Sequence, residues 1–175
     1  MKNKYEIRGD ITVIFLLRRD KTVIETVIDT DDLPEVDAFD GTWYASYDNR
    51  REYFYVTMDR KRISHHLARE LLNVPSGFVV DHINQNTLDN RRSNLRIATI
   101  AENAQNQRLN RNSTSGIRGV YYRRDRDKWQ ASIQLKGKKK FIGIYGTPED
   151  AERAVIKARR EYMPFSQEAT KTIAQ

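Results

Sequence analysis

Short apolar runs separated by polar turns dominate the N-terminal part of the chain, a pattern that predicts strands rather than helices. Twice, two runs rich in β-branched and aromatic side chains flank a polar turn, at residues 18–21 and 48–51, which is typical of a β-hairpin. Residues 29–34 are acidic and are expected to form a loop. The expected strands cover residues 10–17, 22–28, 42–47 and 52–57. We therefore predict a small antiparallel β module over residues 1–61.

The pattern changes after this module to a short helix followed by a strand, a loop, a strand and a second helix. Ser64 is a suitable N-cap for a helix over residues 64–72, because leucines 67, 71 and 72 then share one face. Thr99, with Glu102 three residues later, is typical of a capping box that opens a helix reaching about Asn110. The expected strands are 78–83 and 95–98, on either side of the Asn-rich stretch 84–94.

The C-terminal part predicts one sheet covered by one helix. Residues 110–116 have the composition of a linker. Thr147 and Pro148, followed by two acidic residues, open an amphipathic helix. The expected strands are 119–123, 128–135 and 140–145, and alternation in the second places Trp129, Ala131, Ile133 and Leu135 on one face. The predicted fold class is therefore α+β, in three parts: 1–61, 62–110 and 111–175.

Composition excludes several classes of protein. The 175 residues include no cysteine, so disulfide scaffolds, thiolate zinc sites and thiol nucleophiles are excluded. The longest nearly apolar run, Ile11 to Leu17, is far shorter than the roughly 20 residues that span a bilayer. The first ten residues contain no apolar segment typical of a signal peptide. We expect an intracellular protein with no membrane partner.

Positive charge is concentrated toward the C-terminus. The formal net charge is +7, but residues 1–60 carry −4, residues 61–110 carry +3 and residues 111–175 carry +8. The stretch from Arg111 to Lys140 holds ten basic and two acidic residues. Such a field suits a polyanion, and charge alone leaves a merely solvated basic face equally open.

One set of residues carries candidate chemistry. Asp81 and His82 end a predicted strand, Asn94 follows His82 by 12 residues, and Asn103 lies 9 further on in a predicted helix. Carboxylate and amide oxygens suit Mg²⁺ or Mn²⁺, and a neutral histidine is a natural general base near pH 7. Residue types alone leave two interpretations open, a metal-dependent phosphodiesterase site and ordinary Asn-rich turn material.

The motif Val80-Asp-His-Ile-Asn, then Leu88-Asp-Asn-Arg-Arg-Ser-Asn-Leu-Arg, then Asn103 resembles that of the HNH endonucleases of the phage and intron homing type. The resemblance covers about residues 62–110 and implies a ββα-metal unit. It implies that Asp81 and Asn103 bind one divalent ion, for which we expect Mg²⁺ or Mn²⁺. Because the chain has no cysteine, we do not expect the zinc that some HNH members carry. It also implies that His82 activates water and that Asn94 orients His82.

One departure concerns the preceding helix, where many relatives carry His-Arg and this chain has Ala68-Arg69. His65 and His66 lie nearby but out of register, and we interpret them as an ordinary polar face.

The C-terminal module resembles an AP2 DNA-binding domain in Gly116-Ile-Arg-Gly-Val, Lys128-Trp-Gln-Ala, Phe141-Ile-Gly and the helix that begins at Thr147-Pro. The resemblance implies a three-stranded sheet in the major groove of double-stranded DNA. Trp129 is open to two interpretations, a DNA contact or a core residue. The candidate DNA-binding residues are Arg118, Tyr121, Arg123, Arg124, Trp129, Ser132, Gln134, Lys138, Lys139 and Lys140, with Arg91, Arg92 and Arg96 from the nuclease-like segment.

Together these features predict a site-specific, metal-dependent DNA endonuclease of a phage or intron mobile element, acting in the cytoplasm of a phage-infected bacterium. A monomer is favoured, and no small-molecule substrate is expected. Two alternatives are a non-catalytic DNA-binding protein derived from such a nuclease, and an RNA-binding protein. Strand choice, target sequence and the role of residues 1–61 stay open.

Overall fold

The computed structural model describes residues 1–49, 52–109 and 113–170. The chain forms two compact units, Met1–Ala98 and Thr99–Gln175, which are described here one at a time. Small antiparallel sheets and few helices make up both units, which confirms the predicted α+β class. Residues 50–51 of the predicted turn and residues 110–112 of the predicted linker lie outside the described residues. The predicted boundaries after residues 61 and 110 stay predictions.

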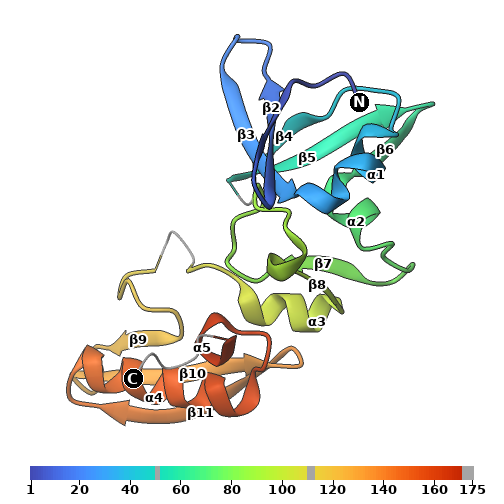
Figure 1. Ribbon diagram of the computed structural model, residues 1–175. Helices are drawn as coiled ribbons and strands as arrows, with labels where there is room; N and C mark the ends of the chain where they lie inside the picture. The colour runs from blue at the N-terminus through green and yellow to red at the C-terminus, as the bar shows by residue number, and fades with distance from the viewer. Residues whose placement is uncertain (50–51, 110–112, 171–175) are drawn as a thin grey trace. The chain divides into compact units, whose positions relative to one another are not determined.

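The first unit contains two three-stranded sheets and one two-stranded sheet, in the orders β1-β2-β3, β4-β5-β6 and β7-β8 (Figure 1). The predicted hairpins are present, and β1, which we did not predict, pairs with β2. The strands are β1 (Tyr5–Arg8), β2 (Ile11–Leu17), β3 (Val23–Asp29), β4 (Tyr44–Asp48), β5 (Tyr53–Arg60), β6 (Ile63–His66), β7 (Val79–His82) and β8 (Leu95–Ala98). The helices are α1 (Leu33–Asp37) and α2 (Leu67–Leu71).

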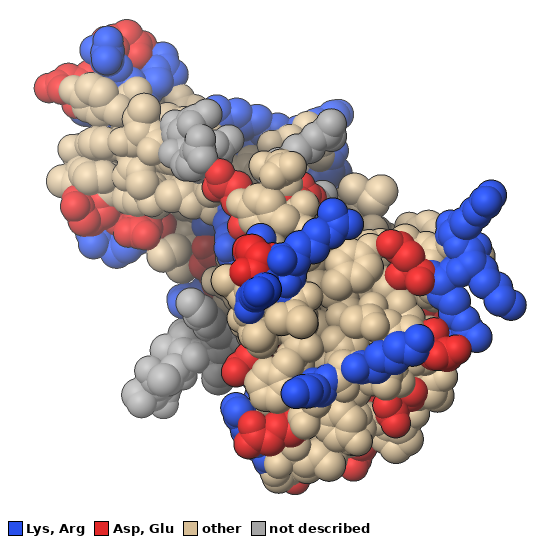
Figure 2. Space-filling model, turned by 90° about the horizontal axis from the view of Figure 1, so that it is seen from above, with Lys and Arg blue, Asp and Glu red and all other residues tan. Residues whose placement is uncertain are grey.

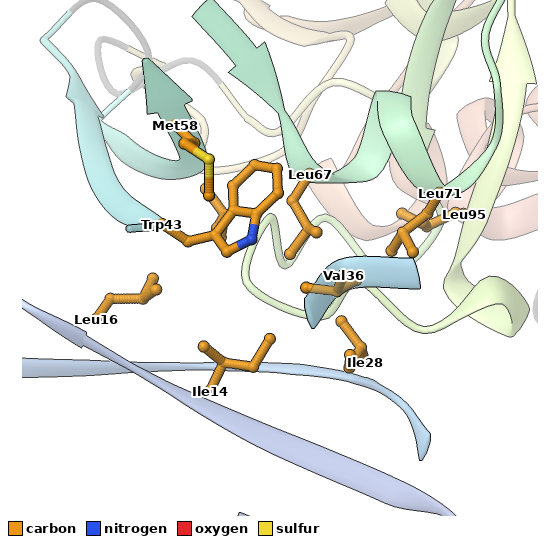
Figure 3. Packing of buried hydrophobic residues seen from close by; sticks show 10 residues of the cluster. Ile14, Leu16, Ile28, Val36, Trp43, Met58, Leu67, Leu71 and Leu95 are labelled. Carbon is orange, nitrogen blue, oxygen red and sulfur yellow. The ribbon is translucent and has the colours of Figure 1, made fainter. Parts of the chain in front are cut away.

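One core joins these elements around Trp43, which is fully buried. Figure 3 shows its indole between Met58 and Leu67, with Val36 and the β2 and β3 side chains beyond. The Phe39 ring meets the Trp43 ring edge-on, with centroids 5.3 Å apart. The cluster draws its buried residues from β2, β3, α1, β5, α2 and β8, together with Trp43 just before β4: Ile14, Leu16, Ile28, Val36, Trp43, Val56, Met58, Leu67, Leu71 and Leu95. Residues far apart in sequence therefore hold the N-terminal sheets and the β7–β8 pair in one body.

The predicted helix over residues 64–72 is wrong in its first half. Lys61 and Arg62 both have positive φ, the geometry of a two-residue hairpin turn, and the chain then returns along β5 as strand β6. The helix begins only at Leu67, with His66 rather than Ser64 as its N-cap. Pairing with the exposed edge of β5 thus outweighs local helix signals.

The second unit begins with the capping box that we predicted. The Thr99 hydroxyl accepts from the Glu102 backbone N–H, and the Glu102 carboxylate accepts from that of Thr99. The helix α3 (Ile100–Asn103) is nevertheless shorter than predicted and continues as one 3₁₀ turn, Ala104–Asn106. The Arg118 guanidinium donates to the carbonyls of residues 104, 105 and 107, which satisfies oxygens that a longer helix would have used.

A three-stranded sheet, β11-β10-β9, fills the rest of the second unit. Its strands are β9 (Val120–Arg123), β10 (Lys128–Leu135) and β11 (Lys138–Tyr145), and its helices are α4 (Pro148–Tyr162) and the short α5 (Gln167–Thr170). Thr147 caps α4 by accepting from the Asp150 N–H, with Pro148 in the first turn, as predicted. Helix α4 buries Ala151, Val155 and Ala158 against one face of the sheet. Among the described residues, no helix has the length and apolar character needed to cross a membrane.

Candidate nuclease site and nucleic-acid surface

Asp81 lies at the end of β7, directly across the ladder from Arg96 on β8. Asp81 is 3% exposed. Arg96 contacts its Oδ2 through Nε at 2.7 Å and through Nη2 at 2.6 Å. A buried carboxylate needs such a partner, because an unpaired charge is costly away from water. The predicted metal ligand is thus paired with a residue that we predicted to bind DNA.

His82 follows Asp81 and is also buried. Its Nε2 lies 3.1 Å from Oδ1 of Asn90, in the loop between β7 and β8. Burial lowers the pKa of His82 below its ordinary value, although the Asn90 hydrogen bond and the carboxylates of Asp81 and Asp89 act in the opposite direction. The lowered pKa favours the neutral ring, which is the form that a general base requires.

Asn94 closes the loop between β7 and β8. Its Oδ1 accepts from the backbone N–H of Asn84 at 2.8 Å, and its Nδ2 donates to the carbonyl of Asp89 at 2.7 Å. Its own carbonyl accepts from the N–H of Ile83 at 2.8 Å. These bonds hold the two ends of the loop together. The described His82 contact is with Asn90, and a direct role for Asn94 in orienting His82 stays a prediction.

The two arginines of this loop are held by carboxylates. Arg91 pairs with both oxygens of the buried Asp89, at 2.8 and 2.7 Å, and this hydrogen bonding lowers the pKa of Asp89. Arg92 Nε donates to Asp32 at 2.8 Å, and its backbone N–H donates to Asp29 at 2.7 Å. Their charges are thus largely balanced within the first unit. We therefore leave Arg91, Arg92 and Arg96 out of the DNA surface proposed below.

Asn103, the second predicted ligand, is the last residue of α3 and belongs to the second unit. Its backbone N–H donates to the Thr99 carbonyl at 2.9 Å, and its side chain is half-buried. Within residues 1–49, 52–109 and 113–170, no three His, Asp or Glu side chains are grouped as a metal site would require.

Helix α4 packs on one face of the C-terminal sheet, and among the described residues the main helix contacts of this sheet are those of α4. Cross-strand partners share a face, so the pairs Tyr121–Gln130 and Gln134–Lys139 lie opposite the side that α4 covers. The Lys139 ammonium lies 4.3 Å from the centre of the Tyr121 ring. We call this side the open face, and its residues are Tyr121, Arg123, Lys128, Gln130, Ser132, Gln134, Lys139, Phe141 and Ile144.

The other predicted DNA-binding residues lie elsewhere in this unit. Trp129 belongs to the side facing α4 and packs against the core, which favours the core interpretation. Lys138 and Lys140 share that side, and the Lys140 ammonium lies 3.3 Å from the centre of the Tyr162 ring on α4. Arg118 is occupied by backbone carbonyls, whereas Arg124 is exposed in the turn after β9. Ser132, although on the open face, is buried.

Basic and acidic side chains are interspersed on the side of the molecule drawn in Figure 2, with neutral surface between them. The open face is distinguished instead by exposed aromatic rings beside basic and amide side chains, and Tyr121 and Phe141 are 47% and 57% exposed.

Sequence reasoning missed two polar residues near His82. Asn90 is 1% exposed and contacts His82, and Thr26 on β3 contacts Asn90. Asn90 stands among several asparagines that we interpreted as turn material. Nothing in the local sequence connects Thr26 to the site, since 64 residues separate it from Asn90.

Comparison with known proteins concerns the segment that holds Asp81 and His82. Residues 64–105 match the family model described as HNH endonuclease. Protein 3.8 of Escherichia phage T7 is 34% identical to this chain over 65 residues, which cover 37% of this chain and 54% of that protein. The chain thus spans about half the length of this curated relative. No solved structure matches. Residues 64–105 are therefore an HNH endonuclease domain.

Proposed function

We propose that this protein is a divalent-metal-dependent endonuclease that hydrolyses phosphodiester bonds in double-stranded DNA. The observation that carries the proposal is that His82, whose pKa is lowered by burial, lies directly beside the buried Asp81 in the segment that matches the HNH endonuclease family. In this proposal His82 Nδ1 or Nε2 takes a proton from the water that attacks phosphorus. The products would be a 3′-hydroxyl and a 5′-phosphate.

The residues present fit a divalent metal in their chemistry. In this proposal Asp81 would supply a buried carboxylate and Asn103 an amide oxygen, both of them hard donors suited to Mg²⁺ or Mn²⁺. Arg96 already offsets one charge on Asp81, so a cation there would share the carboxylate with the guanidinium. A bound ion would supply stabilisation of the negative charge that builds on the phosphate oxygens.

Metal dependence gives the first test of the proposal. Supercoiled DNA is incubated with the full chain and Mg²⁺, Mn²⁺ or EDTA, and nicked and linear products are separated on a gel. We expect products with at least one of the two ions and none with EDTA. Cleavage that persists at full rate in EDTA would contradict a metal-dependent mechanism.

We propose that the open face of the C-terminal sheet is the DNA-binding surface, as the resemblance of this module to AP2 domains implies. Strands enter the major groove in several DNA-binding folds, and arginine, lysine and glutamine are suited to read base edges or hold phosphates. Tyr121, Gln134 and Lys139 project from this face, with Arg123 beside them. The unit that contributes this face carries most of the positive charge of the chain.

Replacing Lys139 with alanine should weaken DNA binding several-fold and reduce the slope of log affinity against log salt by about one. The loss of one phosphate contact is the physical reason. Gel shifts at several salt concentrations measure both quantities. Lys157, exposed on α4, provides a matched control, and Lys157→Ala should bind nearly as wild type does. Equal weakening by both substitutions would point to a general charge effect and against the open face.

The contact between Arg96 and Asp81 favours a second candidate function. Arg96 holds the carboxylate of Asp81, the residue that an active nuclease would use for its metal. This pairing favours a non-catalytic DNA-binding protein derived from an HNH nuclease. Specific DNA binding with no cleavage in either metal would support that alternative.

We also infer an origin in a phage or intron mobile element, and the similarity to a phage protein supports this inference. The identity of the genes beside this one would test it.

A further inference from the structure

We propose that Thr26 and Asn90 are positioning residues that fix His82 in the tautomer with its proton on Nε2, which makes Nδ1 the atom that receives the proton from water. The inference rests on the proposed function only for what Nδ1 does. The tautomer itself follows from a chain of hydrogen bonds within the first unit. It also gives the N-terminal β module a role in the nuclease site.

The chain of hydrogen bonds begins at the carbonyl of Leu88. Thr26 Oγ1 lies 2.7 Å from this oxygen, and the backbone N–H of Val27 donates to the same oxygen at 3.0 Å. A carbonyl only accepts, so the single hydroxyl proton of Thr26 is committed to Leu88. Toward any other neighbour, Thr26 Oγ1 therefore offers lone pairs alone.

The next link is the side-chain amide of Asn90. Its Nδ2 lies 2.9 Å from Thr26 Oγ1 and 3.5 Å from the Thr87 carbonyl, and both of those oxygens act as acceptors. A flipped amide would place Oδ1 against two acceptors and leave a buried carbonyl without a donor there, at a cost of about 1–3 kcal/mol. These two acceptors fix the orientation of the Asn90 amide, so its Oδ1 lies on the side of His82.

The last link is the imidazole of His82. Its Nε2 lies 3.1 Å from Asn90 Oδ1, and an amide oxygen has no proton to give, so Nε2–H must be the donor. In the neutral ring the lone pair then belongs to Nδ1. Thr26 is 0% exposed, Asn90 1% and His82 7%, so bulk water does not replace any partner in this chain.

Strand β3 holds this arrangement in place through its backbone. Val27 and Asp89 form a parallel bridge, in which the Asn90 N–H donates to the Val27 carbonyl at 2.8 Å. Two residues further along, the Asp29 carboxylate accepts from the Arg92 N–H. The loop that carries Asn90 is therefore paired to the N-terminal sheet on both sides of Asn90, and its register sets where the amide points.

The test reads the tautomer directly. The chain is labelled with ¹⁵N-histidine, and long-range ¹H–¹⁵N spectra are recorded without DNA or metal at a pH where the rings are neutral; the His82 signals are assigned by their loss in His82→Ala. We expect wild-type His82 to be protonated on Nε2. Thr26→Val and Asn90→Ala should each shift the ring toward a mixture of tautomers. Thr12→Val, a buried threonine of the same sheet outside this chain of bonds, is the matched control and should leave the spectrum unchanged.

Cleavage provides the second readout. Thr26→Val and Asn90→Ala should lower kcat roughly 10- to 100-fold, in line with losses of partners behind a reactive group, with KM little changed. Thr12→Val should cut as wild type does. A wild-type ring protonated on Nδ1, or a tautomer unchanged by both substitutions, would overturn the inference. Because the spectra need no DNA, failure of all variants to cut DNA would count against the proposed function and leave the tautomer result standing.

Discussion

Replacing His82 with alanine should lower the rate of DNA cleavage about 100- to 10,000-fold, the usual contribution of a general base. The substitution removes the neutral imidazole that would accept a proton from water, while the open face of the C-terminal sheet stays intact. DNA binding should therefore remain close to that of the wild-type protein. Initial rates on supercoiled DNA measure the first effect, and gel shifts measure the second.

His66 provides the matched control for this prediction. It is an exposed histidine at the end of β6 in the same unit, outside the proposed site, and His66→Ala removes the same side chain. We expect this variant to cut DNA at nearly the wild-type rate. Circular dichroism shows whether His82→Ala keeps its fold. If folded His82→Ala cuts as fast as the wild-type protein does, His82 is not the base.

Replacing Trp43 with alanine should lower the free energy of unfolding by about 3–5 kcal/mol, the range for a large aromatic residue in a core. The indole is fully buried among residues of both N-terminal sheets, α1 and α2 (Figure 3). Its loss would leave a cavity where β2, β5 and α2 meet. Urea unfolding followed by far-ultraviolet circular dichroism measures the change.

Trp43→Phe separates packing from polarity at the same position. Among the described residues, Trp43 Nε1 is buried with no hydrogen-bond partner, so phenylalanine removes an unsatisfied donor together with part of the ring volume. The loss of stability should therefore be clearly smaller than for alanine. Leu17→Ala, at a residue 68% exposed, should change stability by less than about 0.5 kcal/mol. A Trp43→Ala protein as stable as Leu17→Ala would contradict the central place of this side chain in the core.

Much of the secondary structure could be predicted because its signals are local. Strand β8 has the predicted bounds, and β10 shows the alternation that places Ala131 and Ile133 against α4. The first half of the helix predicted at 64–72 is a strand because it pairs with β5, an interaction that no local pattern reveals. Helix α1 was missed because its segment begins with acidic residues typical of a loop, although Pro34 sits where a first helical turn tolerates it.

The candidate site was predictable only in part, for the same reason. The local sequence predicts the Asp81–His82 pair at a strand end. It does not predict which side chains contact these two residues. Arg96 contacts Asp81 because the register of β7 and β8 places the two residues opposite each other. We had predicted instead that Arg96 binds DNA. Thr26 reaches Asn90 because β3 packs beside the loop. Cross-strand register and long-range packing thus decide which polar side chains surround the histidine.

Cleavage by three proteins shows whether His82 takes part in DNA hydrolysis as proposed. Wild-type, His82→Ala and His66→Ala proteins are compared on the same supercoiled DNA in Mg²⁺ and in Mn²⁺, with EDTA as the blank. We expect metal-dependent nicked or linear product from wild type and His66→Ala, and at least about 100-fold less from His82→Ala. DNA that stays intact with the wild-type protein in both metals, or equal cleavage by the His82→Ala protein, would contradict the proposal.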